Sequence, residues 1–118
     1  MINQDGSENA DAEINQSGSD NDARIIQTDS DGADSWITQN GAGNQAENLQ
    51  TDSDHAFSSI NQNGSLNTAV VLQNDADHSA SYVLQDGDSN MVFVEQDFGT
   101  HYSAVTQMGN GNMAHVVQ

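Results

Sequence analysis

The chain of 118 residues carries 18 acidic side chains against one arginine, Arg24, so its formal net charge is −17. This charge argues against binding to nucleic acid, since almost nothing would neutralise phosphates, and against insertion into an anionic membrane. The chain has no cysteine, which excludes disulfides and thiolate metal sites. Large apolar residues are few, which is typical of chains that cannot bury enough surface to fold alone.

Regularly spaced glutamines mark out the predicted elements in chain order. Along most of the chain the spacing alternates between two nearly equal values, so that two unequal halves make one repeat, as from Gln16 to Gln39. Ten consecutive gaps of nearly equal length do not arise by chance, and an internal repeat of this length is typical of a stacked array. The marking residues are Gln4, Gln16, Gln27, Gln39, Gln50, Gln62, Gln73, Gln85, Gln96, Gln107 and Gln118.

The segment before each glutamine alternates between two faces, which predicts a β-strand. Residues 1–9 form a partial leading strand and turn, and repeat units follow at 10–32, 33–55, 56–78, 79–100 and 101–118. The predicted strands are 10–16, 21–27, 33–39, 44–50, 56–62, 67–73, 79–85, 90–96, 103–107 and 112–118. Turn formers such as "NGAG", "NGSL" and "TDSDH" separate them. We predict no helix, and one domain that spans residues 1–118.

Stacking of these units gives the expected architecture. Each unit reads strand, turn, strand, turn, and units of fixed length stack on their neighbours as a solenoid. The fold class is therefore all-β: a β-solenoid of five stacked strand-turn-strand repeats with two facing, parallel, in-register sheets. The sheets would lie about 10 Å apart with a rise of about 4.8 Å per repeat, the geometry of a cross-β amyloid.

Stacking would also place identical amides above one another as structural amide ladders. A primary amide both donates and accepts, so it can bond to copies above and below, whereas a lone buried amide would cost on the order of 1–3 kcal/mol. The two glutamine columns are Gln16, Gln39, Gln62, Gln85, Gln107 and Gln27, Gln50, Gln73, Gln96, Gln118. The asparagine column is Asn21, Asn44, Asn67, Asn90 and Asn112.

Charged and titratable residues recur in the predicted turns. One column would hold His55, His78 and His101, either as a pH-sensitive or metal-binding stack or as simple replacements of turn asparagines. Two acidic columns would hold Asp29, Asp52, Asp75 and Asp31, Asp54, Asp77. These carboxylates would act as a charge brake on premature aggregation or recruit a cation such as calcium. We predict no resident metal and no cofactor.

Apolar residues are also predicted on the outward faces of both sheets. Ile26, Leu49 and Leu72 would share a column on one sheet, and Trp36 and Tyr82 would lie on the other. Such residues are either ordinary scattered exposure or a surface on which filaments bundle. Serine, histidine and aspartate recur by period rather than meeting in one pocket, so we expect no enzyme.

The repeat resembles that of curlin, the subunit of bacterial curli fibres. "SASYVLQDGDSNMVFVEQ", residues 79–96, matches the family motif Ser-x5-Gln-x4-Asn-x5-Gln at all four marked positions. "ADSWITQNGAGNQAENLQ", residues 33–50, carries the family's Gly-x-Gly-Asn turn. The chain departs from the family where alanine replaces the leading serine, where histidine or glycine replaces asparagine, and in its near-lack of basic residues.

The resemblance implies a functional amyloid of the extracellular biofilm matrix, which self-assembles into a homopolymeric, cell-surface fibre. It further implies a nucleator subunit, periplasmic and export chaperones, and an outer-membrane secretion channel as partners. Met1 is followed by the mainly polar segment "INQDG", so no signal sequence is visible, and the chain is expected to be either cytosolic or a mature or trimmed form. The alternative is a discrete β-solenoid binding module that displays a cation, ice or glycan surface, although regular Thr-x-Thr ladders are missing.

Overall fold

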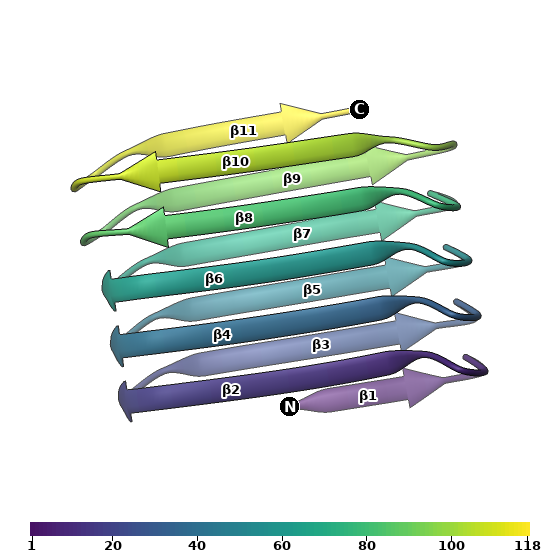
Figure 1. Cartoon of the computed structure of the whole chain (residues 1–118), viewed down its shortest axis with the longest axis horizontal. Helices are drawn as coiled ribbons and strands as arrows, with labels where there is room; N and C mark the ends of the chain where they lie inside the picture. Colours follow the sequence, from purple (N-terminus) through teal and green to yellow (C-terminus); the bar gives the residue numbers. More distant parts are fainter.

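The computed structural model describes residues 1–118 as two parallel β-sheets stacked face to face, with the chain passing back and forth between them (Figure 1). The six-stranded sheet has the order β1 (Ile2–Asp5), β3 (Asp22–Thr28), β5 (Gln45–Thr51), β7 (Thr68–Asn74), β9 (Met91–Asp97) and β11 (Met113–Val117). The five-stranded sheet has the order β2 (Asp11–Ser19), β4 (Asp34–Ala42), β6 (Phe57–Ser65), β8 (Ala80–Asp86) and β10 (Tyr102–Met108). The prediction of an all-β solenoid with two facing parallel sheets is confirmed.

Strand pairing follows the repeat along the whole chain. Each strand pairs with the strand one repeat further on, so that Gln27, Gln50 and Gln73 lie directly above one another. The sequence offset between paired residues is constant up to β9, and it is shorter by one position where β8 pairs with β10 and β9 pairs with β11, because the fourth repeat is one residue shorter. Because the register never slips within a strand pair, inward residues stay inward along both sheets. We call one such layer, with one strand from each sheet, a rung.

The space between the sheets is narrow and unusually polar. The molecule measures 35 × 25 × 11 Å along its principal axes, so the two sheets lie close together. Ile25, Ile37 and Ile60 are the largest buried apolar side chains, and alanine and valine flank them. Polar residues nevertheless outnumber apolar ones among the 33 buried residues. Every buried side-chain nitrogen and oxygen has a hydrogen-bond partner, so burial leaves no polar atom unpaired.

The predicted strand ends need one correction. The segments "SGS", "NGA" and "NGS" that follow Gln16, Gln39 and Gln62 were expected in turns, but they belong to β2, β4 and β6. The pairing continues there because Gly41 lies directly above Gly18 and below Gly64, and only glycine lets the backbones approach closely. These three strands are therefore nine residues long, whereas β8 and β10 have seven.

Candidate functional site

Two continuous glutamine ladders run through the interior. In each, the side-chain Nε2 of one glutamine donates to Oε1 of the glutamine one rung towards the C-terminus, as from Gln27 to Gln50 at 2.9 Å. The six-stranded sheet carries Gln4, Gln27, Gln50, Gln73, Gln96 and Gln118, with Nε2–Oε1 distances of 2.8–3.2 Å. The five-stranded sheet carries Gln16, Gln39, Gln62, Gln85 and Gln107, with distances of 2.7–2.9 Å. All the donors point the same way, so both ladders have a direction.

A second hydrogen bond from the Nε2 of most of these glutamines joins the two sheets. Gln62 Nε2 donates to the carbonyl of Gln45, the first residue of β5, at 2.9 Å. In the opposite direction, Gln73 Nε2 donates to the carbonyl of Phe57, the first residue of β6, at 3.1 Å. The ladder glutamines from Gln27 to Gln96 are therefore each bonded above, below and across the core. The sequence predicted the vertical contacts alone, because the facing carbonyls become visible only when both sheets are in place.

The asparagine column lies where predicted but bonds differently from the glutamines. Asn67 Oδ1 accepts the backbone N–H of Asn90 at 3.0 Å, and its Nδ2 donates to the carbonyl of Gly87 at 2.8 Å. The same pattern holds Asn21, Asn44 and Asn90 to the rung beside them. Asn112, in the last rung, instead donates to Asn90 Oδ1 and to the carbonyl of Met108. Asparagine is one methylene shorter than glutamine, and at the bend between strands it satisfies backbone groups that have left the ladder. Amide-to-amide contacts occur only at the two ends of the column.

A glycine column that the prediction did not single out lies beside these asparagines. Gly18, Gly41, Gly64, Gly87 and Gly109 each follow a glutamine of the repeat by two residues, a signal that the sequence does contain. A Cβ atom on Gly41 would lie 1.8 Å from the carbonyl oxygen of Gly64, and one on Gly64 would lie 2.0 Å from that of Gly87. Their φ angles of +129° and +111° also disfavour any other residue. The glycines thus set how closely successive rungs approach at this end of the five-stranded sheet.

The two acidic columns lie at the opposite turn, and all six carboxylates are exposed. Asp54 Oδ1 accepts the backbone N–H of Asp31 at 2.9 Å, and Asp77 Oδ1 accepts that of Asp54 at 2.9 Å. Asp29, Asp52 and Asp75 adopt a left-handed conformation with φ of +48°, which aspartate tolerates better than most residues. The Asp31, Asp54, Asp77 column therefore combines stacked negative charge with hydrogen bonds between rungs, a role that the sequence pattern did not reveal.

Replacement of Asp31, Asp54 and Asp77 together by asparagine is expected to shorten the lag before fibres form. Asparagine keeps the Oδ1 acceptor but removes the repulsion between stacked charges. In the wild-type chain, the lag should be shorter near pH 4 than near pH 8, and shorter with calcium than without it. In the variant both differences should shrink. Equal wild-type lag times under all these conditions, followed with an amyloid dye, would refute the charge brake.

The predicted column of three histidines is wrong at His101. His55 and His78 do stack, with ring centroids 5.1 Å apart and planes within 13° of parallel. Because the fourth repeat is one residue shorter, His101 lies over Ser79 instead: its backbone N–H donates to Ser79 Oγ, and its carbonyl accepts the N–H of Ala80. Its ring reaches the carbonyl of Asp97 at 3.1 Å. No group of three or more His, Cys, Asp or Glu side chains is arranged to hold a metal ion.

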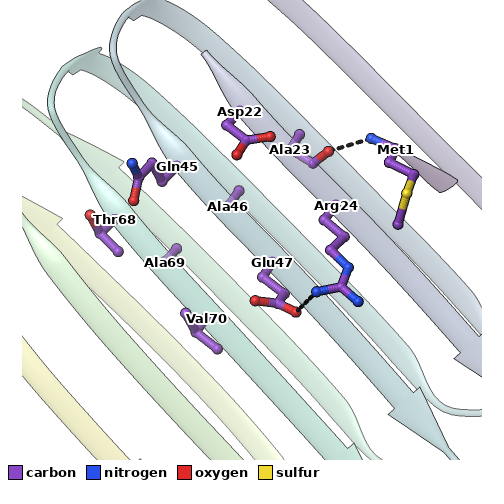
Figure 2. Close-up of a pocket in the computed structure, with 10 residues that line it drawn as sticks. All are labelled: Met1, Asp22, Ala23, Arg24, Gln45, Ala46, Glu47, Thr68, Ala69 and Val70. Atoms are coloured by element: carbon purple, nitrogen blue, oxygen red, sulfur yellow. Dashed lines mark hydrogen bonds and ion pairs between the residues drawn. The ribbon is translucent and has the colours of Figure 1, made fainter. Parts of the chain in front are cut away.

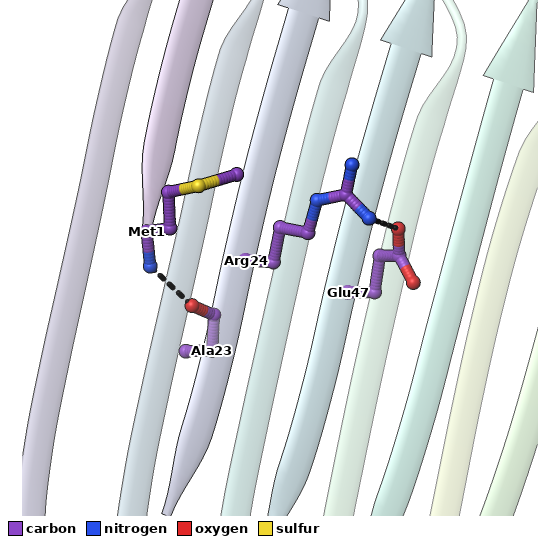
Figure 3. Close-up of polar contacts among 4 residues, drawn as sticks. All are labelled: Met1, Ala23, Arg24 and Glu47. Atoms are coloured by element: carbon purple, nitrogen blue, oxygen red, sulfur yellow. Dashed lines mark hydrogen bonds and ion pairs between the residues drawn. The ribbon is translucent and has the colours of Figure 1, made fainter.

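The surface of the two sheets carries shallow grooves. A shallow groove of about 400 Å³ on the six-stranded sheet runs over the first residues of β3, β5 and β7 (Figure 2). In it, Arg24 pairs with Glu47 at 3.1 Å, and the terminal ammonium of Met1 donates to the carbonyl of Ala23 (Figure 3). Both partners of the Arg24–Glu47 pair are well exposed, so it contributes little to stability. No helix in the structure is suited to crossing a membrane.

Comparison with known proteins identifies the repeat. The family model of the curlin associated repeat matches three segments, residues 1–28, 59–97 and 87–118, which together cover most of the chain. No curated protein matches the chain. The matched segments contain the first and the last glutamines of both ladders. The remaining residues, 29–58, continue the same strand register between the matched segments.

Proposed function

This chain belongs to the family of curlin associated repeats, and from that premise we propose that it polymerises into extracellular, cell-surface amyloid fibres. The family comprises structural subunits of curli type rather than enzymes. The fibres would form a biofilm matrix and hold cells to surfaces and to one another. Export would require a secretion channel in the outer membrane and chaperones, and a nucleator subunit would start growth at the cell.

The observation that carries this proposal is the strict repetition of contacts from rung to rung. Gln39, Gln62 and Gln85 make the same pair of hydrogen bonds one repeat apart, so each rung offers the next one a complete set of partners. The outermost strands, β1 and β2 on one side and β10 and β11 on the other, each have one neighbour in their sheet. Such unpaired edges are templates for further strands.

The proposed mechanism is templated addition of a disordered chain to the fibre end. Away from a fibre, the high charge and the scarcity of large apolar residues oppose collapse. At a fibre end, an incoming segment gains main-chain hydrogen bonds and partners for its glutamines at once. The unsatisfied polar groups that would penalise an isolated rung are thereby removed as each rung is added.

The test is incubation of the purified chain, monitored by amyloid dye and electron microscopy. We expect unbranched fibres after a lag, and we expect fragments of preformed fibres to remove the lag, because they supply finished templates. Fibres of an unrelated amyloid are the control and should leave the lag unchanged. A chain that stays a monomer of constant size while showing strand signal would contradict the proposal and would favour a discrete binding module.

A further inference from the structure

Four aromatic residues form a continuous strip on the outer face of the five-stranded sheet. Trp36 on β4 contacts Phe57 on β6, with ring centroids 5.0 Å apart. Phe57 contacts Tyr82 on β8 at 5.1 Å, and Tyr82 contacts Tyr102 on β10 at 5.8 Å. We call these four residues the aromatic strip. Tyr102, Tyr82 and Trp36 remain 66%, 43% and 44% exposed, so the strip is a surface feature without a partner in this chain.

The sequence pattern revealed only part of the aromatic strip, because the residues of the strip alternate between two columns. Trp36 and Tyr82 share a column with Ser59 and Ala104, whereas Phe57 and Tyr102 share the neighbouring one. Within each column a large residue follows a small one, so the rings zigzag up the face. Beside Tyr82, the small side chains of Ser59 and Ala104 help to form a shallow hollow of about 220 Å³. The face therefore has both projections and recesses.

Ring orientation argues against a flat platform for sugars. The planes of Phe57 and Tyr82 are inclined by 34°, with ring centroids 5.1 Å apart. Trp36 meets Phe57 edge to face, at 88°. The four rings are therefore not coplanar, whereas a flat platform for sugars needs ring faces that lie in one plane.

Charge singles out this face for contact between copies. Between β4 and β10 the outward residues of the five-stranded sheet include two charged side chains, Asp34 and Asp86, both at strand ends, and β2 adds Asp11 and Glu13 at the edge of the sheet. Between β3 and β9 the outward residues of the six-stranded sheet include five charged side chains, with Arg24, Glu47 and Glu95 in the middle of the strands and Asp22 and Asp97 at strand ends. For chains of net charge −17, close approach is least opposed by repulsion where the surface is neutral.

We propose that the outer face of the five-stranded sheet pairs two copies of this chain side by side, with projecting rings seated in the recesses of the partner. The face measures at most 35 × 25 Å, the two larger dimensions of the molecule. Its area is therefore on the order of the roughly 800 Å² that each partner buries in a stable interface. Within a fibre the contact repeats with every subunit and becomes a dry seam between paired filaments. The inference rests on the proposed function, because it concerns filaments.

A matched pair of variants tests the pairing. Ser59→Glu places a carboxylate in the middle of the five-stranded sheet, where Glu13 already occupies the same column two rungs below. Val70→Glu places one in the middle of the six-stranded sheet, where Glu47 is its neighbour in the column. Tyr82→Ser is a second variant that removes a ring at a position where Ser59 shows that serine fits.

The readout is the mass per unit length of filaments, measured by scanning transmission electron microscopy. We expect paired filaments for the wild type and for Val70→Glu, and a twofold lower value for Ser59→Glu and Tyr82→Ser. If filaments of both Ser59→Glu and Tyr82→Ser remained paired, the inference would be overturned and the proposed function would stand. The same conclusion would follow if Val70→Glu abolished pairing. Wild-type filaments that are single would also overturn the inference. This holds as well if such single filaments bind a soluble neutral glucan through the outer face of the five-stranded sheet. Absence of filaments in the wild type would overturn both proposals.

Discussion

Replacement of Gln62 by leucine is expected to raise the monomer concentration left in equilibrium with fibres at least about tenfold. Gln62 accepts from Gln39 Nε2 and donates to Gln85 Oε1, both at 2.8 Å, and is fully buried. Leucine would leave an N–H of Gln39 and the Oε1 of Gln85 without partners, at roughly 1–3 kcal/mol each, and would also remove the bond to the carbonyl of Gln45. About 1.4 kcal/mol corresponds to a factor of ten. The measurement is the soluble fraction after fibres have reached equilibrium.

Gln45→Leu is the matched control for this experiment. Gln45 is the one glutamine off the repeat, and its side chain is exposed at the start of β5. The same chemical change there removes no buried amide, so the soluble fraction should stay within a factor of about three of the wild type. Equal effects of the two substitutions would mean that the ladders add nothing beyond ordinary burial.

Gly64→Ala is expected to abolish templated growth. Its Cβ would lie 2.0 Å from the carbonyl oxygen of Gly87, a backbone atom that cannot move aside without opening the rung spacing. The φ of +111° adds strain of its own. Monomer carrying this substitution should neither extend wild-type fibre fragments nor develop strand signal by circular dichroism on the wild-type timescale.

Gly111→Ala separates the effect of contact from that of backbone strain. Gly111 also has a positive φ, +70°, but nothing lies within 4 Å of the position that its Cβ would occupy. We expect only the cost of a left-handed alanine, about 1–2 kcal/mol, with growth slowed but retained. If Gly64→Ala grew as well as Gly111→Ala, the glycine column would not control the spacing of rungs.

The fold was predictable because, in a solenoid, the length of the repeat fixes which residues of neighbouring strands pair. Once Gln27, Gln50 and Gln73 are placed one repeat apart, parallel pairing fixes every other neighbour along the strands. Alternation within each strand then assigns inward and outward residues, and small inward residues predict closely spaced sheets. The sequence also contains the glycine column, at a constant two residues after each glutamine, although turn propensity concealed its place within strands β2, β4 and β6.

Details that depend on the missing residue and on contacts across the core were not predictable from the pattern. The deletion before His101 is absorbed in the turn, and only the backbone shows that His101 aligns with Ser79 rather than with His78. Likewise, the cross-core bond from Gln62 to the carbonyl of Gln45 depends on the stagger between the sheets. The zigzag of Trp36 and Phe57 joins two columns and has no signature in either one.

The central claim is that interior amides are stable here because identical amides lie one rung above and one rung below. A density map of the fibre at side-chain resolution tests it most directly. The predicted result is that Gln39, Gln62 and Gln85 point between the sheets, with each Nε2 within hydrogen-bond distance of the next Oε1. A map in which these side chains face solvent, or in which consecutive repeats lie out of register, would contradict the account.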